Sequence, residues 1–227
     1  MKKLIFPVLL AALFAGGCKE GPKNEKNPET VEVAPKNLLE LLADKHGFEN
    51  WDQVKRIAFT FNVDRGTSHF ERSWIWDLSE DRVTQVTGTD TLTYQRAAVD
   101  STLARADAAF INDKFWLLAP YQWVWDQENF TYEYQDRARA PISGDTLQRL
   151  TVVYGQEGGY TPGDAYDFYL GKDSVLREWI YRKGNQPEPS LATTWEGYKE
   201  FRGLSLATEH KNAEGNFRLY FTGIRVE

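Results

Sequence analysis

Along most of the chain, large apolar residues alternate with polar ones, which is the period expected of strands that bury one face. The alternation is clearest near residue 60, where Ile57, Phe59, Phe61 and Val63 fall on one side. Short clusters of Gly, Pro, Asn and Asp separate the runs and supply turns. Because such connections leave no room for crossover helices, the pattern predicts antiparallel pairing and excludes a doubly wound fold. The predicted strands span 56–63, 68–78, 82–87, 92–96, 130–134, 147–154, 164–170, 175–182, 191–201, 204–209 and 217–226.

Two short segments before the first strand have helical spacing instead. Residues 37–46 place their leucines and Ala43 on one stripe, with Asn37 suited to cap the start and Gly47 suited to end the helix. Residues 48–54 continue with a second short helical stretch that leads into the first strand. An amphipathic N-terminal helix is therefore expected to pack against the sheet.

The longest helical pattern, at 100–119, interrupts the run of strands. Because proline lacks a backbone N–H, Pro120 is predicted to end this helix, and the aromatic residues 121–126 are predicted to form a separate strand or loop. Several strands, such as 164–170, carry large apolar side chains on both faces and need a cover on both. We therefore expect the segment 106–126, with the N-terminal helix, to cover one face of the sheet.

The first seventeen residues have the pattern of a secretory signal. Lys2 and Lys3 precede an apolar run that is too short to span a bilayer, and small residues then lead to Cys18. This ending resembles the lipobox of bacterial lipoproteins, although Ala15 stands where Leu is usual. The resemblance implies that residues 1–17 are removed and that Cys18 is acylated, and several acyl chains together would hold the protein durably on a membrane.

The chain that follows Cys18 is poor in large apolar residues and rich in Lys, Glu, Asn and Pro. We expect 18–36 to be a flexible tether and 37–227 to be one domain. The chain has 227 residues and a formal net charge of −6; without Lys2 and Lys3, 25 basic residues oppose 33 acidic ones, which gives −8. This acidic balance argues against nucleic acid as a partner and against docking on anionic lipid.

The titratable residues form no recognisable catalytic or metal-binding pattern. His46, His69 and His210 are the only histidines, and no two of them are spaced to bind a metal from one helix or strand face. We interpret them as surface or hydrogen-bonded side chains. Asp164 and Asp167 fall on opposite faces of an alternating strand, which argues against paired catalytic carboxylates. The sequence predicts no metal, no cofactor and no enzymatic activity.

One charged residue lies on an aromatic strand face. Arg72 alternates with Phe70, Trp74 and Trp76. Its guanidinium can stack on an indole or pair with a carboxylate such as Asp113, and either contact satisfies it without a ligand. The alternative is that Arg72 binds the head group of an amphipathic ligand.

Four longer phrases are similar to a family of Bacteroidota outer-membrane lipoproteins of unknown function. They are GFENWDQVKRIAFTFNVDRG, FINDKFWLLAPYQWVWD, TVVYGQEGGYTPGDAYDFYL and ATEHKNAEGNFRLYFTGIRVE. The order of elements also resembles the half-barrel of the lipoprotein carrier and its receptor, the LolA/LolB group. That resemblance implies an α+β domain with a single, strongly curved antiparallel sheet whose concave face is covered by helices. It also implies an apolar ligand between sheet and helices, and Cys18 favours the anchored, receptor-like arrangement.

The resulting hypothesis is a non-enzymatic lipoprotein of the outer membrane that binds a lipid or another hydrophobic ligand, on either the periplasmic or the cell-surface side. A surface lipoprotein that stacks glycans on Trp and Tyr is one alternative, and a scaffold that fills its own core is another. The helical segment would contribute one wall of the site and the sheet the other. The residues assigned to these walls are Phe110, Phe115, Trp116, Leu117, Leu118, Trp123 and Trp125 on the helical side, and Phe59, Phe61, Arg72, Trp74, Trp76, Tyr166 and Phe168 on the sheet.

Overall fold

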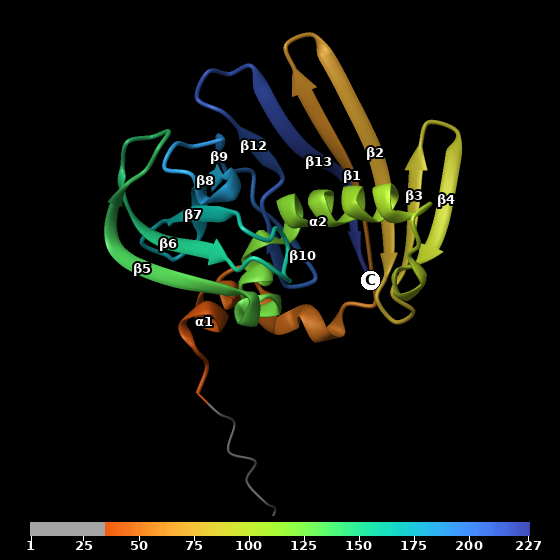
Figure 1. Cartoon of the computed structure of the whole chain (residues 1–227), viewed down its shortest axis with the longest axis horizontal. Coiled ribbons are helices and arrows are strands. Elements are labelled where there is room, and N and C mark those ends of the chain that lie inside the picture. Colours follow the sequence, from red (N-terminus) through yellow and green to blue (C-terminus); the bar gives the residue numbers. More distant parts are fainter. Residues whose placement is uncertain (1–34) are drawn as a thin grey trace, which may run out of the picture. The chain divides into compact units, whose positions relative to one another are not determined.

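A computed structural model describes residues 35–227 of the chain (Figure 1). The predicted signal, Cys18 and most of the predicted tether lie outside the described residues. Lys36–Glu227 forms one compact unit with a continuous hydrophobic core. All the strand pairs described below lie within this unit, so it has what a domain needs to fold on its own. None of the helices in the described part of the chain is long and apolar enough to cross a membrane.

The larger of two main sheets has six antiparallel strands (Figure 1). The hairpin of the first two strands has an uninterrupted register from Arg56 opposite Asp77 to Arg65 opposite Ser68. The last strand of the chain pairs with the other edge of the first strand. In order across the sheet, the strands are β12 (Glu209–Lys211), β13 (Phe217–Val226), β1 (Arg56–Arg65), β2 (Ser68–Asp77), β3 (Arg82–Thr87) and β4 (Asp90–Gln95).

The second main sheet is a five-stranded antiparallel meander, and a separate two-stranded hairpin follows it. The pattern of alternating residues thus correctly predicts antiparallel strands throughout. The strands of the meander are β5 (Phe130–Arg139), β6 (Thr146–Tyr154), β7 (Ala165–Leu170), β8 (Leu176–Arg182) and β9 (Leu191–Thr194), and those of the hairpin are β10 (Lys199–Phe201) and β11 (Leu204–Leu206).

The α+β class is confirmed, but the prediction of a single sheet is wrong, because the described residues form three sheets. The predicted strand at 191–201 breaks after Thr194. There the chain leaves β8, and the backbone of Glu196 bridges to Glu209 of β12 instead. Gly197 then takes a left-handed conformation (φ 64°), which turns the chain into the β10–β11 hairpin. The backbone bridge between Glu196 and Glu209 therefore links the two main sheets at the point where the sequence predicts one continuous sheet.

The central helix, α2 (Ala104–Trp125), contradicts a second prediction, because Pro120 does not end it. The backbone instead kinks at Leu118 (φ −123°, ψ 22°), two residues before the proline, and residues 121–125 remain helical. The prediction of a strand or loop at 121–126 is therefore wrong. Burial holds the second half of the helix in place, and the hydroxyl of Tyr121 donates to the carbonyl of His46 at 2.7 Å.

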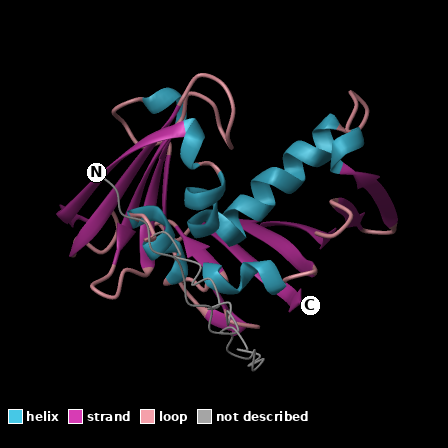
Figure 2. Cartoon of the chain, turned by 90° about the horizontal axis from the view of Figure 1, so that it is seen from below, coloured by secondary structure: helices cyan, strands magenta, loops and turns pink. Residues whose placement is uncertain are grey.

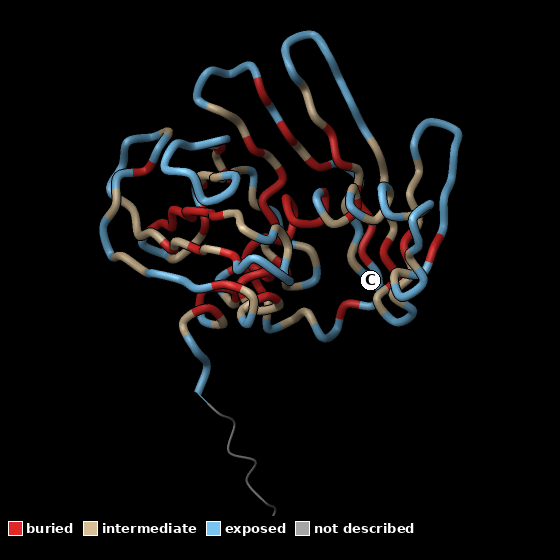
Figure 3. The backbone as a smooth tube through the Cα atoms, viewed as in Figure 1, coloured by how far each residue is buried: buried red, intermediate tan, exposed pale blue. Residues whose placement is uncertain are grey.

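The two halves of α2 pack against different sheets, and the second half is more buried than the first (Figures 2 and 3). Phe110, in the first half, packs edge-on between Trp74 and Trp76 of β2, with ring centroids 5.4 and 5.5 Å away. Trp123, in the second half, packs on Phe168 of β7 at 5.1 Å. The tips of the hairpins are exposed, whereas the buried residues gather along α2 and the strand segments that face it (Figure 3). The helix is thus a shared core element for the two main sheets.

The N-terminal helices form as predicted. In α1 (Leu38–Asp44), the Asn37 side chain accepts from the Glu40 amide at 3.0 Å, and the Glu40 carboxylate accepts from the Asn37 amide at 2.7 Å. Gly47 follows with a φ of 85°, and a side chain there would meet the Gly203 carbonyl at 1.9 Å. This close approach packs the next element against the β10–β11 hairpin. The remaining short 3₁₀ helices are η1 (Phe48–Gln53), η2 (Arg96–Ala98), η3 (Gln127–Asn129) and η4 (Lys183–Asn185).

Candidate functional site

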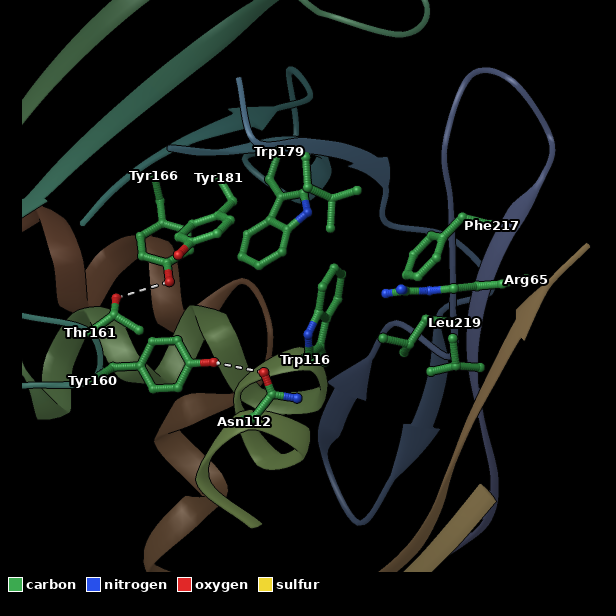
Figure 4. A pocket seen from close by; sticks show the side chains of 12 residues that line it. Arg65, Asn112, Trp116, Tyr160, Thr161, Tyr166, Trp179, Tyr181, Phe217 and Leu219 are labelled. Carbon is green, nitrogen blue, oxygen red and sulfur yellow. Dashed lines mark hydrogen bonds between the residues drawn. The ribbon is translucent and has the colours of Figure 1, made fainter. Parts of the chain in front are cut away.

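An open cavity of about 280 Å³ lies between the two main sheets, with α2 at its base (Figure 4). Small-molecule sites typically begin at roughly 300 Å³, so the space suits one ring system or a short chain. Elements far apart in the sequence supply the lining. The lining residues are Val63 and Arg65 from β1, Phe217 and Leu219 from β13, Tyr166 from β7, Trp179 and Tyr181 from β8, Leu191 from β9, Asn112 and Trp116 from α2, and Tyr160 and Thr161 from the loop before β7.

Aromatic side chains form the inner wall of the cavity. Trp116 meets Trp179 edge-on at 4.5 Å, and Tyr166 stacks on Trp179 at 5.3 Å and on Tyr181 at 5.2 Å. The strand register explains this arrangement, because Tyr166 of β7 lies opposite Tyr181 of β8. Aromatic neighbours across two strands share one face of the sheet and pack together. The wall is therefore apolar and rigid, and it continues the protein core.

The rim of the cavity is polar but has no group that titrates near neutral pH. The hydroxyl of Tyr181 donates to Asp164 at 2.9 Å, and burial together with this bond raises the pKa of Tyr181 to about 12. The hydroxyls of Tyr166 and Thr161 bond each other at 2.9 Å, and burial raises the pKa of Tyr166 above its ordinary value. Tyr160 donates to Asn112 at 3.5 Å (Figure 4). The tyrosine hydroxyls therefore stay protonated at neutral pH and can donate hydrogen bonds.

Among residues 35–227, Arg65 is the only charged residue that lines the cavity. Its side chain extends into the space toward Trp116, and its guanidinium carbon lies 5.3 Å from the centre of the Phe217 ring (Figure 4). The adjacent carboxylate, Asp64, contacts His69 at 2.7 Å and Arg218 at 3.8 Å instead. Within residues 35–227, Arg65 forms no salt bridge, so its positive charge faces the cavity without a protein counter-charge.

Of the fourteen residues predicted to bind a ligand, Trp116 and Tyr166 line this cavity. The helical and sheet sets do meet, but most of their members pack on one another, as Phe110 does on Trp74 and Trp123 does on Phe168. Trp125 is half-buried against Trp51 at 5.0 Å. The fully buried members, each less than one-tenth exposed, are Phe110, Phe115, Trp116, Leu117, Leu118, Trp123, Phe59, Phe61, Trp74, Trp76, Tyr166 and Phe168.

Arg72 has a protein partner, as one of its two interpretations predicts. Its Nε and terminal nitrogen donate to the two carboxylate oxygens of Asp113 at 2.5 and 2.7 Å. The Asp113 carboxylate also accepts from the Trp74 indole at 2.8 Å and from the Asn112 amide at 3.0 Å. The Arg72 charge is thereby neutralised, and the ion pair ties α2 to β2.

Sequence reasoning missed Arg65, Tyr160 and Trp179 as residues of the site. Tyr160 sits in a glycine-rich loop and stacks flat on Phe115, with centroids 3.8 Å apart and planes 2° apart. A side chain at Gly159 (φ 71°) would overlap the Tyr154 ring at 2.7 Å, so this glycine is required for the loop to lie so close. The repeated glycines are the one local signal that could have indicated a loop packed against the core.

The structure shows the surroundings of the histidines and of the two aspartates that were considered as metal ligands or catalytic acids. No cluster of three metal-ligating side chains occurs in residues 35–227. His46 and His210 are buried and hydrogen-bonded, whereas His69 is exposed. Asp164 accepts from Tyr181 and from the Gly184 amide, whereas Asp167 binds Arg182 and Thr151. The two carboxylates therefore have separate partners and do not form a shared acid pair.

Comparisons with known proteins give distant likenesses only. No protein-family model and no curated protein matches the sequence. A DUF1329 family protein from Desulfovibrio piger is 12% identical, with a TM-score of 0.47 over 85% of this chain and 94% of its own. A LolA superfamily protein from Nitrosomonas europaea is 7% identical, with the same TM-score and the same coverage. An outer-membrane lipoprotein-sorting protein domain from Vibrio parahaemolyticus is 14% identical, with a TM-score of 0.40 over 82% of this chain and 93% of its own.

At this level of similarity, the likenesses assign neither a family nor a function to the chain. The resemblances to a Bacteroidota lipoprotein family and to the LolA/LolB group therefore stay predictions. Any function has to be argued from the cavity itself.

Proposed function

We propose that the domain binds a small hydrophobic or amphipathic ligand in the cavity between the two main sheets, without converting it chemically. The observation that carries this proposal is an open cavity whose wall is formed by the buried aromatic residues Trp116, Tyr166 and Trp179 and whose lining includes the exposed Arg65. An apolar wall with a few polar groups at the rim is typical of small-molecule binding sites. Burial of apolar ligand area, at about 25 cal/mol per Å², would supply the driving force.

The size of the cavity narrows the ligand class. About 280 Å³ accommodates one ring system or a short acyl chain, whereas a lipid with two long chains does not fit in the observed conformation. The residues that line the space include no nucleophile activated by a base, because the lining hydroxyls belong to Thr161 and to tyrosines. These residues therefore best support a function in which the ligand is bound but not chemically converted.

Acylation of Cys18 and attachment to the outer membrane are part of the same proposal. They rest on the signal, the small residues before Cys18 and the polar residues 19–36. An anchor of this kind would keep the cavity close to a membrane, which is a source of apolar ligands. Protease treatment of intact cells would decide between the periplasmic and the cell-surface side, since only a surface protein is digested.

The two alternatives to a hydrophobic ligand are weaker. Glycan binding needs exposed aromatic faces, but all eight tryptophans are buried or half-buried in the structure. A scaffold without a ligand accounts for the packed residues, such as Phe110 on Trp74, but not for an open aromatic space that adjoins the core.

Filling the cavity is expected to abolish most of the binding. Leu191 is half-buried at the cavity wall, so Leu191→Trp should occupy ligand space and weaken the affinity for the neutral fluorescent probe N-phenyl-1-naphthylamine at least tenfold, or about 1.4 kcal/mol. Fluorescence titration of the Lys36–Glu227 unit measures this, after thermal unfolding has verified that each variant folds cooperatively.

Leu92→Trp is the matched control, because Leu92 is an exposed leucine on β4 and does not line the cavity. This variant should bind the probe as the parent does. Equal affinities for Leu191→Trp and the parent would contradict the assigned site, and a parent that binds no apolar probe would contradict the function. Mass spectrometry of a solvent extract would identify any ligand that is carried from the host.

A further inference from the structure

We propose that the cavity selects ligands that carry an anionic group, and that Arg65 binds this group while the ring or chain lies against Trp116 and Trp179. This inference rests on the proposed function of the same cavity and adds the chemical class of the ligand. The class is a small amphiphile with one carboxylate, sulfonate or phosphate at the end of an apolar body.

Arg65 is positioned so that its side chain reaches the cavity. It is the last residue of β1, and its backbone lies opposite Phe217 of β13 and Ser68 of β2. Its guanidinium extends over the Phe217 ring at 5.3 Å and into the cavity (Figure 4). A cation over an aromatic face is held in place without losing its charge or its N–H donors. The side chain is thus oriented while its donors remain free for a ligand.

The positive charge of Arg65 has no counter-charge in the described part of the protein. The chain is acidic, and several partly buried arginines of the domain have a carboxylate partner, as Arg72 has Asp113, Arg96 has Asp107 and Arg182 has Asp167. Arg65 is exposed and forms no salt bridge within residues 35–227, and no carboxylate in this part of the chain lines the cavity. An exposed arginine beside an apolar space can bind an anion that enters that space.

Polar groups lie at the two ends of the cavity, and apolar groups lie between them. Arg65 lies on the side of β1 and β13, whereas Tyr160 and Thr161 lie on the opposite side beyond Trp116 (Figure 4). Between these ends, the ring faces of Trp116 and Trp179 and the side chain of Leu219 offer mainly apolar contact. A ligand that matches this layout has its single charge at one end, which excludes zwitterionic and uniformly polar molecules.

Two probes that share a ring system test the inference directly. N-phenyl-1-naphthylamine is neutral, and 8-anilino-1-naphthalenesulfonate carries a sulfonate on the same rings. In Arg65→Gln, the dissociation constant of the sulfonate probe should rise about tenfold or more, because a charge-assisted hydrogen bond is lost. The dissociation constant of the neutral probe should change less than twofold in the same variant. Octanoate should displace the sulfonate probe from the parent more effectively than octanol does.

Arg137→Gln is the matched control, because Arg137 is an exposed arginine on β5 that is remote from the cavity lining and also has no salt bridge within the described residues. It should leave both dissociation constants unchanged. Arg65→Lys keeps the charge and should retain part of the preference for the sulfonate, which provides a second measurement should Arg65→Gln fail to fold. Raising the salt concentration from 0.05 to 0.5 M should weaken binding of the sulfonate probe to the parent, but not its binding to Arg65→Gln.

The outcomes separate the two proposals. If both probes bind the parent and Arg65→Gln changes neither constant, or changes both equally, the anion inference is overturned and the cavity remains a general apolar site. If neither probe nor octanoate binds the parent, the proposed function itself fails. Loss of sulfonate binding in the Arg137→Gln control as well would mean that the probe responds to overall charge, which also overturns the inference.

Discussion

Replacing Asp113 with alanine is expected to lower the free energy of unfolding by about 3–5 kcal/mol, because it leaves a buried charge without its partner. Asp113 is 0% exposed, and the Arg72 side chain that it binds is 18% exposed. The carboxylate accepts from four donors on Arg72, Trp74 and Asn112. Truncation leaves all four donors without this acceptor. It also removes the ion pair that ties the first half of α2 to β2. Urea unfolding followed by circular dichroism measures the change.

Two further variants show whether the unpaired charge is the cause. In the double variant Arg72→Met with Asp113→Leu, both charges are gone, and at least about 1 kcal/mol of the loss should return. Asp173→Ala is the control, since its pair with Arg177 is exposed and should contribute less than about 1 kcal/mol. A loss below 1 kcal/mol for Asp113→Ala would contradict this account of the pair.

Acidification from pH 7.5 to 4.5 is expected to cost the domain about 5 kcal/mol of stability through His46 and His210. Burial lowers the pKa of His46 to about 4 and that of His210 to about 3. Both groups are ordinary histidines in the unfolded chain, with a pKa near 6.5. Between pH 6.5 and 4.5, these two histidines therefore bind protons in the unfolded chain but not in the folded domain. The free energy of unfolding consequently falls as the pH falls.

The contacts of His46 give an independent reason for its neutral form. Its Nδ1 lies 3.0 Å from the carbonyl of Leu42, whereas its Nε2 accepts from the amide of Leu176 at 3.1 Å. This pair of partners assigns the proton to Nδ1. A second proton on Nε2 would face the Leu176 N–H, and α1 would lose its link to β8. His210 is 0% exposed, with Nδ1 at 3.2 Å from the carbonyl of Thr194.

Single substitutions separate the two histidines. His46→Gln and His210→Gln should each remove about half of the loss between pH 7.5 and 4.5, whatever they do to stability at pH 7.5. His69→Gln is the control, because the hydrogen bond of the exposed His69 to Asp64 raises the pKa of His69 and gives a dependence of the opposite sign. Carboxylates such as Asp77, whose pKa the Ser79 hydrogen bond lowers, act mainly below pH 4. A slope that persists unchanged in both glutamine variants would refute the assignment.

Local patterns predicted those parts of the fold that local chemistry determines. Alternation along the strands indicated antiparallel pairing, and the Asn37 cap formed because its partner Glu40 is three residues away. The pairing of Arg72 with Asp113 was foreseeable for a different reason, since a charge among aromatic residues requires a counter-charge. In these cases, the interaction depends on residue type and spacing more than on the global topology.

The mistaken predictions concern features that distant residues determine. Pro120 would end an isolated helix, but burial of Tyr121 and Trp123 stabilises the residues after the kink. The split between sheets depends on the bridge from Glu196 to Glu209, which no periodicity encodes. The cavity likewise arises from the placement of several strands and a loop, so its aromatic residues could be predicted as core but not as an open wall.

The opening of the cavity has a consequence for the timing of ligand exchange. The cavity is open and its lining includes the exposed Arg65, so a ligand that binds there, as we propose, would enter without separating Phe110 from Trp74 or Trp123 from Phe168. Association at such a site is not limited by opening of the core, and a small contact area gives a short residence time. A ligand held there is therefore available for rapid passage to another acceptor and is poorly protected for storage.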